Sequence, residues 1–162
     1  MVFSSTTFLF LFLPIVLIAY YNPIFKSLPF KNAVLIVSSI FFYAWGEPVY
    51  VLLMLGSILI NWALGLAVDK NRDSKKGKAA LTASVVANIG MLFVFKYLTF
   101  TLQNINALLH TSFDTLNITL PIGISFFTFQ AMSYVIDVYR HDGEVQKNPC
   151  NVALYISFFP QL

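Results

Sequence analysis

The sequence predicts an all-α integral membrane protein, a multi-span helical bundle with about five transmembrane helices. Apolar residues make up 58% of its 162 positions and charged residues only 10%, where soluble domains average about 45–50% and about 25%. Five of the ten cations crowd into one short polar stretch, residues 69–78, as in a cytoplasmic loop between membrane spans. So few charges cannot cover a water-soluble globule. The expected surroundings are therefore a lipid bilayer, and no nucleic-acid partner is expected.

Each apolar run is an expected span. In chain order the predicted spans are residues 2–21, 32–45, 49–68, 79–98 and 120–139. A run of twenty residues reaches across a hydrocarbon core of about 30 Å, and Pro14 is expected to kink the first run. Residues 32–45 are short for a span and end at the break Gly46-Glu47-Pro48. Residues 99–119 are mixed in polarity and are expected to form an amphipathic segment on the membrane surface.

The positive-inside rule orients these spans. With residues 69–78 in the cytoplasm, the connections at 22–31 and 140–148 lie there too. The amino terminus and the break at 46–48 then lie outside. A single bent helix over 32–68 is the alternative, and it would swap the sides that precede it. The hairpin is favoured because it places every cation-bearing loop on one face.

Small and polar residues at four-residue spacing predict close helix packing. Ser57, Asn61 and Gly65 form one such face, and a second consists of Ala79, Ala83 and Ala87. Asn61 and Asn88 are expected to bridge neighbouring helices. A structural role is favoured for all of these residues.

The most informative segment is residues 120–140, LPIGISFFTFQAMSYVIDVYR. On a helix, Gln130, Ser133, Asp137 and Arg140 fall within an arc of about 80°. Such a polar stripe usually faces the bundle interior or a water-filled cavity. The alternative is an ordinary interfacial ion pair between Asp137 and Arg140, and the residue pattern leaves both interpretations open.

Other chemistry has little support in the sequence. His110 and His141 have no second ligand at metal-binding spacing, so no metal site is expected. Phosphate-binding loops and nucleophile motifs are not found either. No catalytic residue is assigned, and no bound cofactor is expected.

Several motifs resemble those of bacterial members of the membrane-bound O-acyltransferase (MBOAT) family. They are the opening MVFSS, SIFFYAWGEP at 39–48, Asn61-Trp62, LPIGISFFTFQ at 120–130, YVIDVYR at 134–140 and FFPQL at 158–162. The resemblance runs essentially from end to end. It is nearest to the branch of the family that takes part in alginate O-acetylation.

This resemblance implies a multi-pass protein of a bacterial inner membrane that takes part in O-acetylation of an exported polysaccharide. The implied acyl donor is acetyl-CoA or another cytoplasmic acyl thioester, and the implied acceptor is alginate. Periplasmic or membrane-anchored acetyltransferases are the implied partners. Relatives that act on peptidoglycan, cellulose or teichoic acid have similar opening segments, so those acceptors stay open. Gln130, Ser133, Asp137 and Arg140 would line the acyl tunnel or its cytoplasmic mouth.

The family's hallmark histidine lies downstream of the FFPQL motif, and neither His110 nor His141 corresponds to it. Residues 1–162 are therefore expected to be a single transmembrane region, the N-terminal portion of an acyltransferase domain. A histidine base or intermediate is central to the implied acyl transfer, so this portion is expected to be inactive by itself. Two other functions stay open. They are a non-catalytic scaffold for partner subunits and a small transporter.

Overall fold

The computed structural model describes residues 5–23, 27–109 and 119–161, and this part of the chain contains helices and connections but no strand. Two short π-helical turns, η1 and η2, interrupt the α-helices. The elements are η1 (Phe8–Phe12), α1 (Leu13–Tyr20), α2 (Leu28–Gly46), α3 (Tyr50–Lys70), α4 (Lys75–Leu92), η2 (Phe93–Tyr97), α5 (Leu98–Leu109), α6 (Ile124–Arg140) and α7 (Pro149–Ser157). The chain is an all-α membrane protein, as predicted.

Three of the described helical segments are long and apolar enough to cross a membrane. They are Leu28–Gly46, Tyr50–Lys70 and the continuous run Lys75–Leu109. The first predicted span corresponds to a shorter apolar helix, Phe8–Tyr20. The last predicted span corresponds to α6, which has 17 residues. Three of the five predicted spans therefore have full membrane-crossing length.

Two helices begin earlier than predicted because of residues at their N-termini. The second span was placed at 32–45, but α2 already begins at Leu28, with Pro29 in its first turn. Proline suits that position because its missing N–H needs no partner there. The fourth span was placed at 79–98, but α4 begins at Lys75, where the Ser74 side chain accepts hydrogen bonds from two backbone N–H groups. The connections are therefore shorter than the predicted 22–31 and 69–78.

α6 shows the opposite error, since the span predicted to begin at residue 120 begins at Ile124. Gly123 precedes the helix with a φ of 74°. This left-handed conformation costs glycine little because glycine has no Cβ. Pro121 lies just before it, so residues 120–123 form the entry to the helix and not its first turn.

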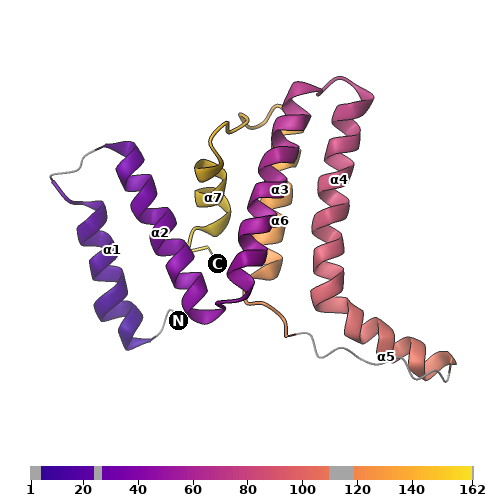
Figure 1. Cartoon of the computed structure of the whole chain (residues 1–162), viewed down its shortest axis with the longest axis horizontal. Coiled ribbons are helices and arrows are strands. Elements are labelled where there is room, and N and C mark those ends of the chain that lie inside the picture. The colour runs from indigo at the N-terminus through magenta and orange to yellow at the C-terminus, as the bar shows by residue number, and fades with distance from the viewer. Residues whose placement is uncertain (1–4, 24–26, 110–118, 162) are drawn as a thin grey trace.

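The predicted hairpin is confirmed, because α2 and α3 are separate helices joined by residues 47–49. As a result, the first residues of α2 and α4 and the last residues of α3 and α6 lie on the same side of the bundle (Figure 1). We call this the basic end, because Arg72, Lys75 and Arg140 lie there. The opposite end carries the hairpin and the start of α5.

A kink was predicted at Pro14, and the structure has a π-helical turn just before this proline. η1 ends at Phe12, and α1 follows with Pro14 in its first turn. A proline leaves a backbone carbonyl without its usual partner, and wider helical turns can satisfy it within an apolar segment. The first helix therefore continues through the proline.

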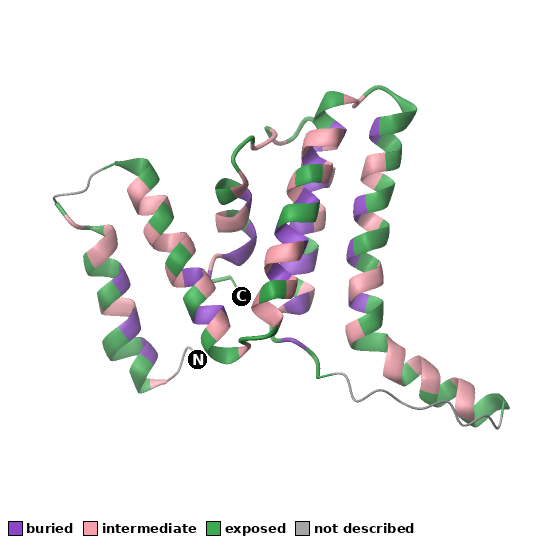
Figure 2. Cartoon of the chain, viewed as in Figure 1, coloured by how far each residue is buried: buried purple, intermediate pink, exposed green. Residues whose placement is uncertain are grey.

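The main core lies between α3, α4, α6 and α7. Met54, Phe127 and Val135 are fully buried in it. Buried residues line the facing sides of α3 and α6, whereas the outward sides are exposed (Figure 2). Since many exposed side chains are large and apolar, this surface suits lipid better than water.

A buried amide network joins α3 to α4, as predicted for Asn61 and Asn88. The Asn88 Nδ2 atom donates to Asn61 Oδ1 at 2.8 Å, and Asn61 Nδ2 donates to Asn88 Oδ1 at 3.2 Å. Ser84 Oγ donates to Asn61 Oδ1 at 2.8 Å. All three residues are buried. This network fixes how α3 and α4 lie against each other.

The second predicted packing face, Ala79, Ala83 and Ala87, is wrong, because all three alanines are exposed. The buried side of α4 instead consists of Gly77, Ser84, Asn88 and Leu92. Asn61 and Asn88 explain the difference. Their paired amides turn the polar face of α4 toward α3, and the alanines then point outward.

A smaller aromatic cluster joins the first helix to α2 and to the end of the chain. Phe8, Phe12 and Val16 recur every four residues and pack with Phe42 and Phe159. The Phe159 backbone N–H also donates to Ser39 Oγ at 3.2 Å. The last described residues are thus tied to α2.

Candidate functional site

All four predicted site residues lie on α6, but the structure brings only two of them together. Ser133 Oγ donates to Asp137 Oδ2 at 3.3 Å. Gln130 Nε2 instead donates to Gln161 Oε1 at 2.7 Å. Arg140 turns away from Asp137, since its Nε lies 3.2 Å from Asp142 Oδ2.

The alternative of an ion pair between Asp137 and Arg140 is therefore wrong. Arg140 pairs with Asp142, and both side chains are exposed. An ion pair in such a position contributes little to stability. The role of Gln130, Ser133, Asp137 and Arg140 as tunnel lining stays a prediction.

Asp137 borders a cavity of about 390 Å³ at the basic end of the bundle. The cavity lies between α2, α6, α7 and the connection between α6 and α7. Its polar lining consists of Asn32, Tyr134, Asp137, Glu144, Gln146, Asn151 and Tyr155. Two carboxylates and several hydrogen-bonding groups thus surround a space with no lining cation among the described residues. Such a space can accept hydrogen-bond donors from a small polar group.

The turn after α6 folds the chain back toward Asp137. The carbonyl oxygen of Asp137 accepts from the N–H groups of His141, Asp142 and Gly143, the last two at 3.0 and 3.2 Å. His141 adopts a left-handed φ of 66° to make this turn. Because of this reversal, Glu144 and Gln146 return to the cavity that Asp137 borders.

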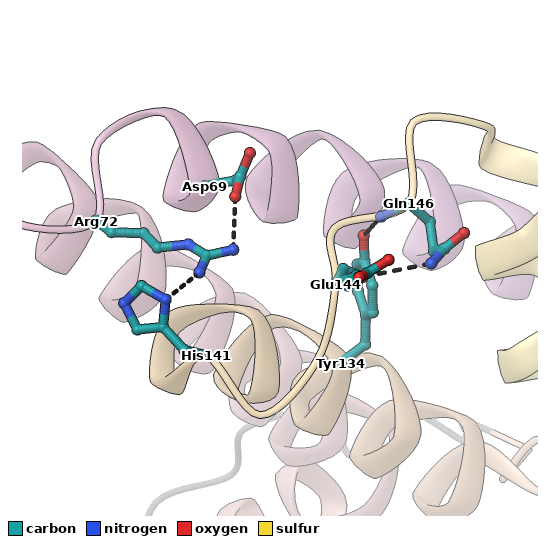
Figure 3. A network of polar contacts seen from close by, with 6 residues as sticks. All are labelled: Asp69, Arg72, Tyr134, His141, Glu144 and Gln146. Atoms are coloured by element: carbon teal, nitrogen blue, oxygen red, sulfur yellow. Dashed lines mark hydrogen bonds and ion pairs between the residues drawn. The ribbon is translucent and has the colours of Figure 1, made fainter.

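Two aromatic side chains then hold the returning chain at Gln146. The Gln146 N–H donates to the Tyr134 hydroxyl at 3.1 Å, and its carbonyl accepts from Trp62 Nε1 at 3.0 Å. Asn151 Nδ2 donates to the Gln146 side chain at 2.9 Å. We call the bonds from Trp62 and Tyr134 to the Gln146 backbone the Gln146 clamp, and Figure 3 shows its Tyr134 half. The clamp ties one wall of the cavity to both α3 and α6.

A second contact joins the α3–α4 turn to the end of α6. The Arg72 guanidinium forms an ion pair with Asp69 and a hydrogen-bonding contact with His141 Nδ1 (Figure 3). The Arg72 side chain is only 16% exposed, so water screens these contacts less than at an open surface. His141 therefore acts here as a link between turns.

Sequence reasoning missed the Gln146 clamp. Trp62 and Tyr134 entered only as parts of motifs, and nothing near them indicated a shared partner. Gly65 was the residue that could have indicated a close contact here, since a Cβ at that position would lie 2.8 Å from Tyr134 Cε1. A small residue in a membrane helix predicts a close neighbour, but the neighbour itself cannot be named from spacing.

No metal centre is evident in the described residues, since they contain no group of three or more His, Cys, Asp or Glu side chains that could hold an ion. His110, for which no metal-binding role was predicted, lies outside the described residues. Cys150 is exposed at the start of α7.

The fold and the site define this chain as a helical membrane protein with a carboxylate-lined cavity at its basic end. Along its entire length the chain is similar to probable alginate O-acetylases AlgI, with 39% identity in Pseudomonas putida and 38% in Pseudomonas aeruginosa. It is 31% identical to a peptidoglycan O-acetyltransferase of Helicobacter pylori. These similarities are consistent with the predicted resemblance to the N-terminal portion of a membrane-bound O-acyltransferase.

The chain spans about a third of the length of these relatives, with 34%, 32% and 36% of each covered. No family model matches it. No solved structure is similar to it.

Proposed function

We propose that this chain is part of a multi-pass inner-membrane O-acyltransferase subunit that takes part in O-acetylation of exported alginate. The observation that carries the proposal is the similarity of the whole chain to alginate O-acetylases, at 39% identity to that of Pseudomonas putida. The cavity beside Asp137, which has both polar and apolar lining, supports it, because an acyl donor needs a path into an otherwise apolar bundle.

The charges of the helix ends support a cytoplasmic position for the basic end. Lys70, Lys75, Lys76 and Lys78 are all exposed there, and positive charge is retained on the cytoplasmic side of membranes. The cavity beside Asp137 lies at the same end. We therefore propose that acetyl-CoA or another cytoplasmic acyl thioester approaches from this side.

The opposite end of the bundle would then face the periplasm. The exported polysaccharide and the periplasmic or membrane-anchored acetyltransferase partners would meet the protein there. The acetyl group would leave its thioester on the cytoplasmic side and be esterified to a sugar hydroxyl on the other, and the thiol would stay in the cytoplasm.

Peptidoglycan is the second candidate acceptor. The chain is 31% identical to the peptidoglycan O-acetyltransferase of Helicobacter pylori, again over its whole length. The higher identity to the alginate relatives favours alginate.

Deletion of the gene tests both acceptors in one strain. The acetyl content of exported alginate and of purified peptidoglycan would be measured by proton NMR, before and after complementation with the full-length gene. Loss from alginate alone supports the proposal, and loss from peptidoglycan alone supports the second candidate. Unchanged acetylation of both polymers would reject both.

A further inference from the structure

A second hollow, separate from the cavity beside Asp137, lies along the first helix. Its volume is about 540 Å³, and its lining comes from the first helix, from Leu35 of α2 and from residues 158–160. Leu13, Val16 and Leu17 are among the lining residues of the first helix. We call this hollow the α1 groove. Its volume lies within the range of about 300–1,000 Å³ that is usual for ligand pockets.

Aromatic packing fixes the walls of the α1 groove. Phe8 and Phe159 both line it, and their ring centres lie 6.2 Å apart. The Phe159 ring also contacts Phe12 edge to face at 5.5 Å. The hydrogen bond from the Phe159 N–H to Ser39 holds the same residue against α2. The groove is therefore formed by packing within the chain and needs no ligand to open it.

The α1 groove is deep enough for one leaflet of a bilayer. Its lining extends along the chain from Phe8 to Tyr21, a length of about 20 Å at 1.5 Å per helical residue. Half of a hydrocarbon core measures about 15 Å. The last residues of α1 lie at the basic end, next to the first residues of α2 (Figure 1). The groove thus leads from the membrane interior to the boundary at the basic end.

The end of the groove at this boundary carries aromatic and cationic groups. Tyr20 and Tyr21 line the groove, and their rings meet edge to face at 5.1 Å. The Lys31 ammonium lies 5.2 Å from the centre of the Tyr20 ring. Residues 1–46 contain two lysines and no acidic residue, so this part of the sequence offers no carboxylate to Lys31. Tyrosine and lysine at the end of an apolar groove are typical of the headgroup level.

We infer that the α1 groove binds an anionic phospholipid of the leaflet at the basic end. One acyl chain lies against Leu13, Leu17 and Leu35, and the phosphate lies beside Lys31. The tyrosine hydroxyls at the same end are able to donate hydrogen bonds to phosphate or ester oxygens. Basic residues near a membrane surface attract anionic lipids. This charge complementarity favours an anionic lipid over an apolar protein segment, which would bring no anion to Lys31.

Photolabelling of the full-length protein tests this binding site without reference to acetylation. The protein is placed in phosphatidylethanolamine nanodiscs with a small fraction of phosphatidylglycerol that carries a diazirine on one acyl chain. Mass spectrometry then measures the label on residues 13–21. The label on the α4 peptide around Val86, which is 64% exposed, serves as the reference for general lipid contact. A phosphatidylethanolamine probe with the same diazirine measures the preference for an anionic headgroup.

Two pairs of variants identify the walls and the cation of the site. Leu17→Trp fills the groove, and the control is Ile18→Trp, at a position that is 72% exposed and outside the lining. Lys31→Gln removes the cation, and the control is Lys76→Gln at an exposed position of the basic end. The thermal stability of each variant is measured. If Leu17→Trp does not fold, Lys31→Gln still decides the test.

We expect the phosphatidylglycerol probe to label residues 13–21 more strongly than the α4 reference and more strongly than the phosphatidylethanolamine probe does. Leu17→Trp should abolish this excess, and Lys31→Gln should lower it about fivefold, the effect expected of one lysine on anionic lipid. Both controls should keep it. Labelling no stronger than that of α4 would show that lipid does not occupy the groove and would overturn the inference. Equal labelling by the two probes, or labelling that Lys31→Gln leaves unchanged, would overturn it as well.

Discussion

Gly65 shows how one missing methyl group shapes the site. A Cβ there would lie 2.8 Å from Tyr134 Cε1 and 3.1 Å from the Tyr134 hydroxyl oxygen. We expect Gly65→Ala to displace this ring, weaken the Gln146 clamp and lower the free energy of unfolding by about 1–3 kcal/mol. Gly56→Ala is the matched control, since no atom lies within 4 Å of its added Cβ. Equal thermal stability of the two variants would contradict the proposed close approach.

Asn61 provides a second test at the level of one residue. Asn61→Ala leaves the Asn88 amide and the Ser84 hydroxyl without this partner in a buried setting, so a loss of about 1–2 kcal/mol in unfolding free energy is expected. A double-mutant cycle with Asn88→Ala isolates the coupling. Asn104→Ala on exposed α5 is the control. If the losses of stability caused by Asn61→Ala and Asn88→Ala simply added in the double variant, the network would be contradicted.

Asp137 is the residue whose replacement bears on function. In the full-length protein, Asp137→Ala is expected to lower the acetyl content of the exported polymer without preventing membrane insertion, because it removes a carboxylate from the cavity. Asp142→Ala removes an exposed carboxylate nearby and should leave acetylation unchanged. Acetyl content and membrane-bound protein are measured in the same cells. Wild-type acetylation in the Asp137 variant would reject its role as tunnel lining.

At the level of single elements, local signals predicted where helices occur better than where they begin. The hairpin at 46–48 follows from residue type alone, because glycine and proline change the backbone directly. The early start of α2 has Pro29 in its first turn, and that of α4 depends on the side-chain cap of Ser74. A serine in a polar stretch does not reveal by itself whether it caps a helix. The starts of α2, α4 and α6 therefore shifted by four residues each, whereas the existence of these three helices was predicted.

The connection between α6 and α7 should depend on Trp62 for its rigidity. Trp62→Phe keeps an aromatic ring but removes the donor to the Gln146 carbonyl. One such bond contributes about 1 kcal/mol, so hydrogen exchange in residues 141–148 should become about fivefold faster. Mass spectrometry of peptides from this connection measures the rate. Trp45→Phe, on an exposed part of α2, should leave the rate unchanged, and equal rates in both variants would contradict the clamp.

For the whole molecule, composition and apolar runs were enough to predict an all-α membrane protein, but helix pairing was not. The polar stripe on α6 was visible in the sequence, yet Gln130, Asp137 and Arg140 have three different partners. Gln130 contacts Gln161, Asp137 contacts Ser133 and Arg140 contacts Asp142. These pairs have different separations along the sequence, so the helical repeat of α6 could not predict them together. The outward alanines of α4 were mistaken for a packing face for the same reason, because spacing alone cannot say which of two faces meets a neighbour.

Transfer of an acetyl group through the membrane is the central claim, and sealed inside-out vesicles test it most directly. Vesicles with the full-length protein and its partner subunits would enclose alginate oligosaccharides, and a radiolabelled acetyl thioester would be added outside, at the cytoplasmic face. We expect label to appear in the enclosed sugar, and none in vesicles from the deletion strain. Equal labelling of the sugar in both preparations would contradict the account.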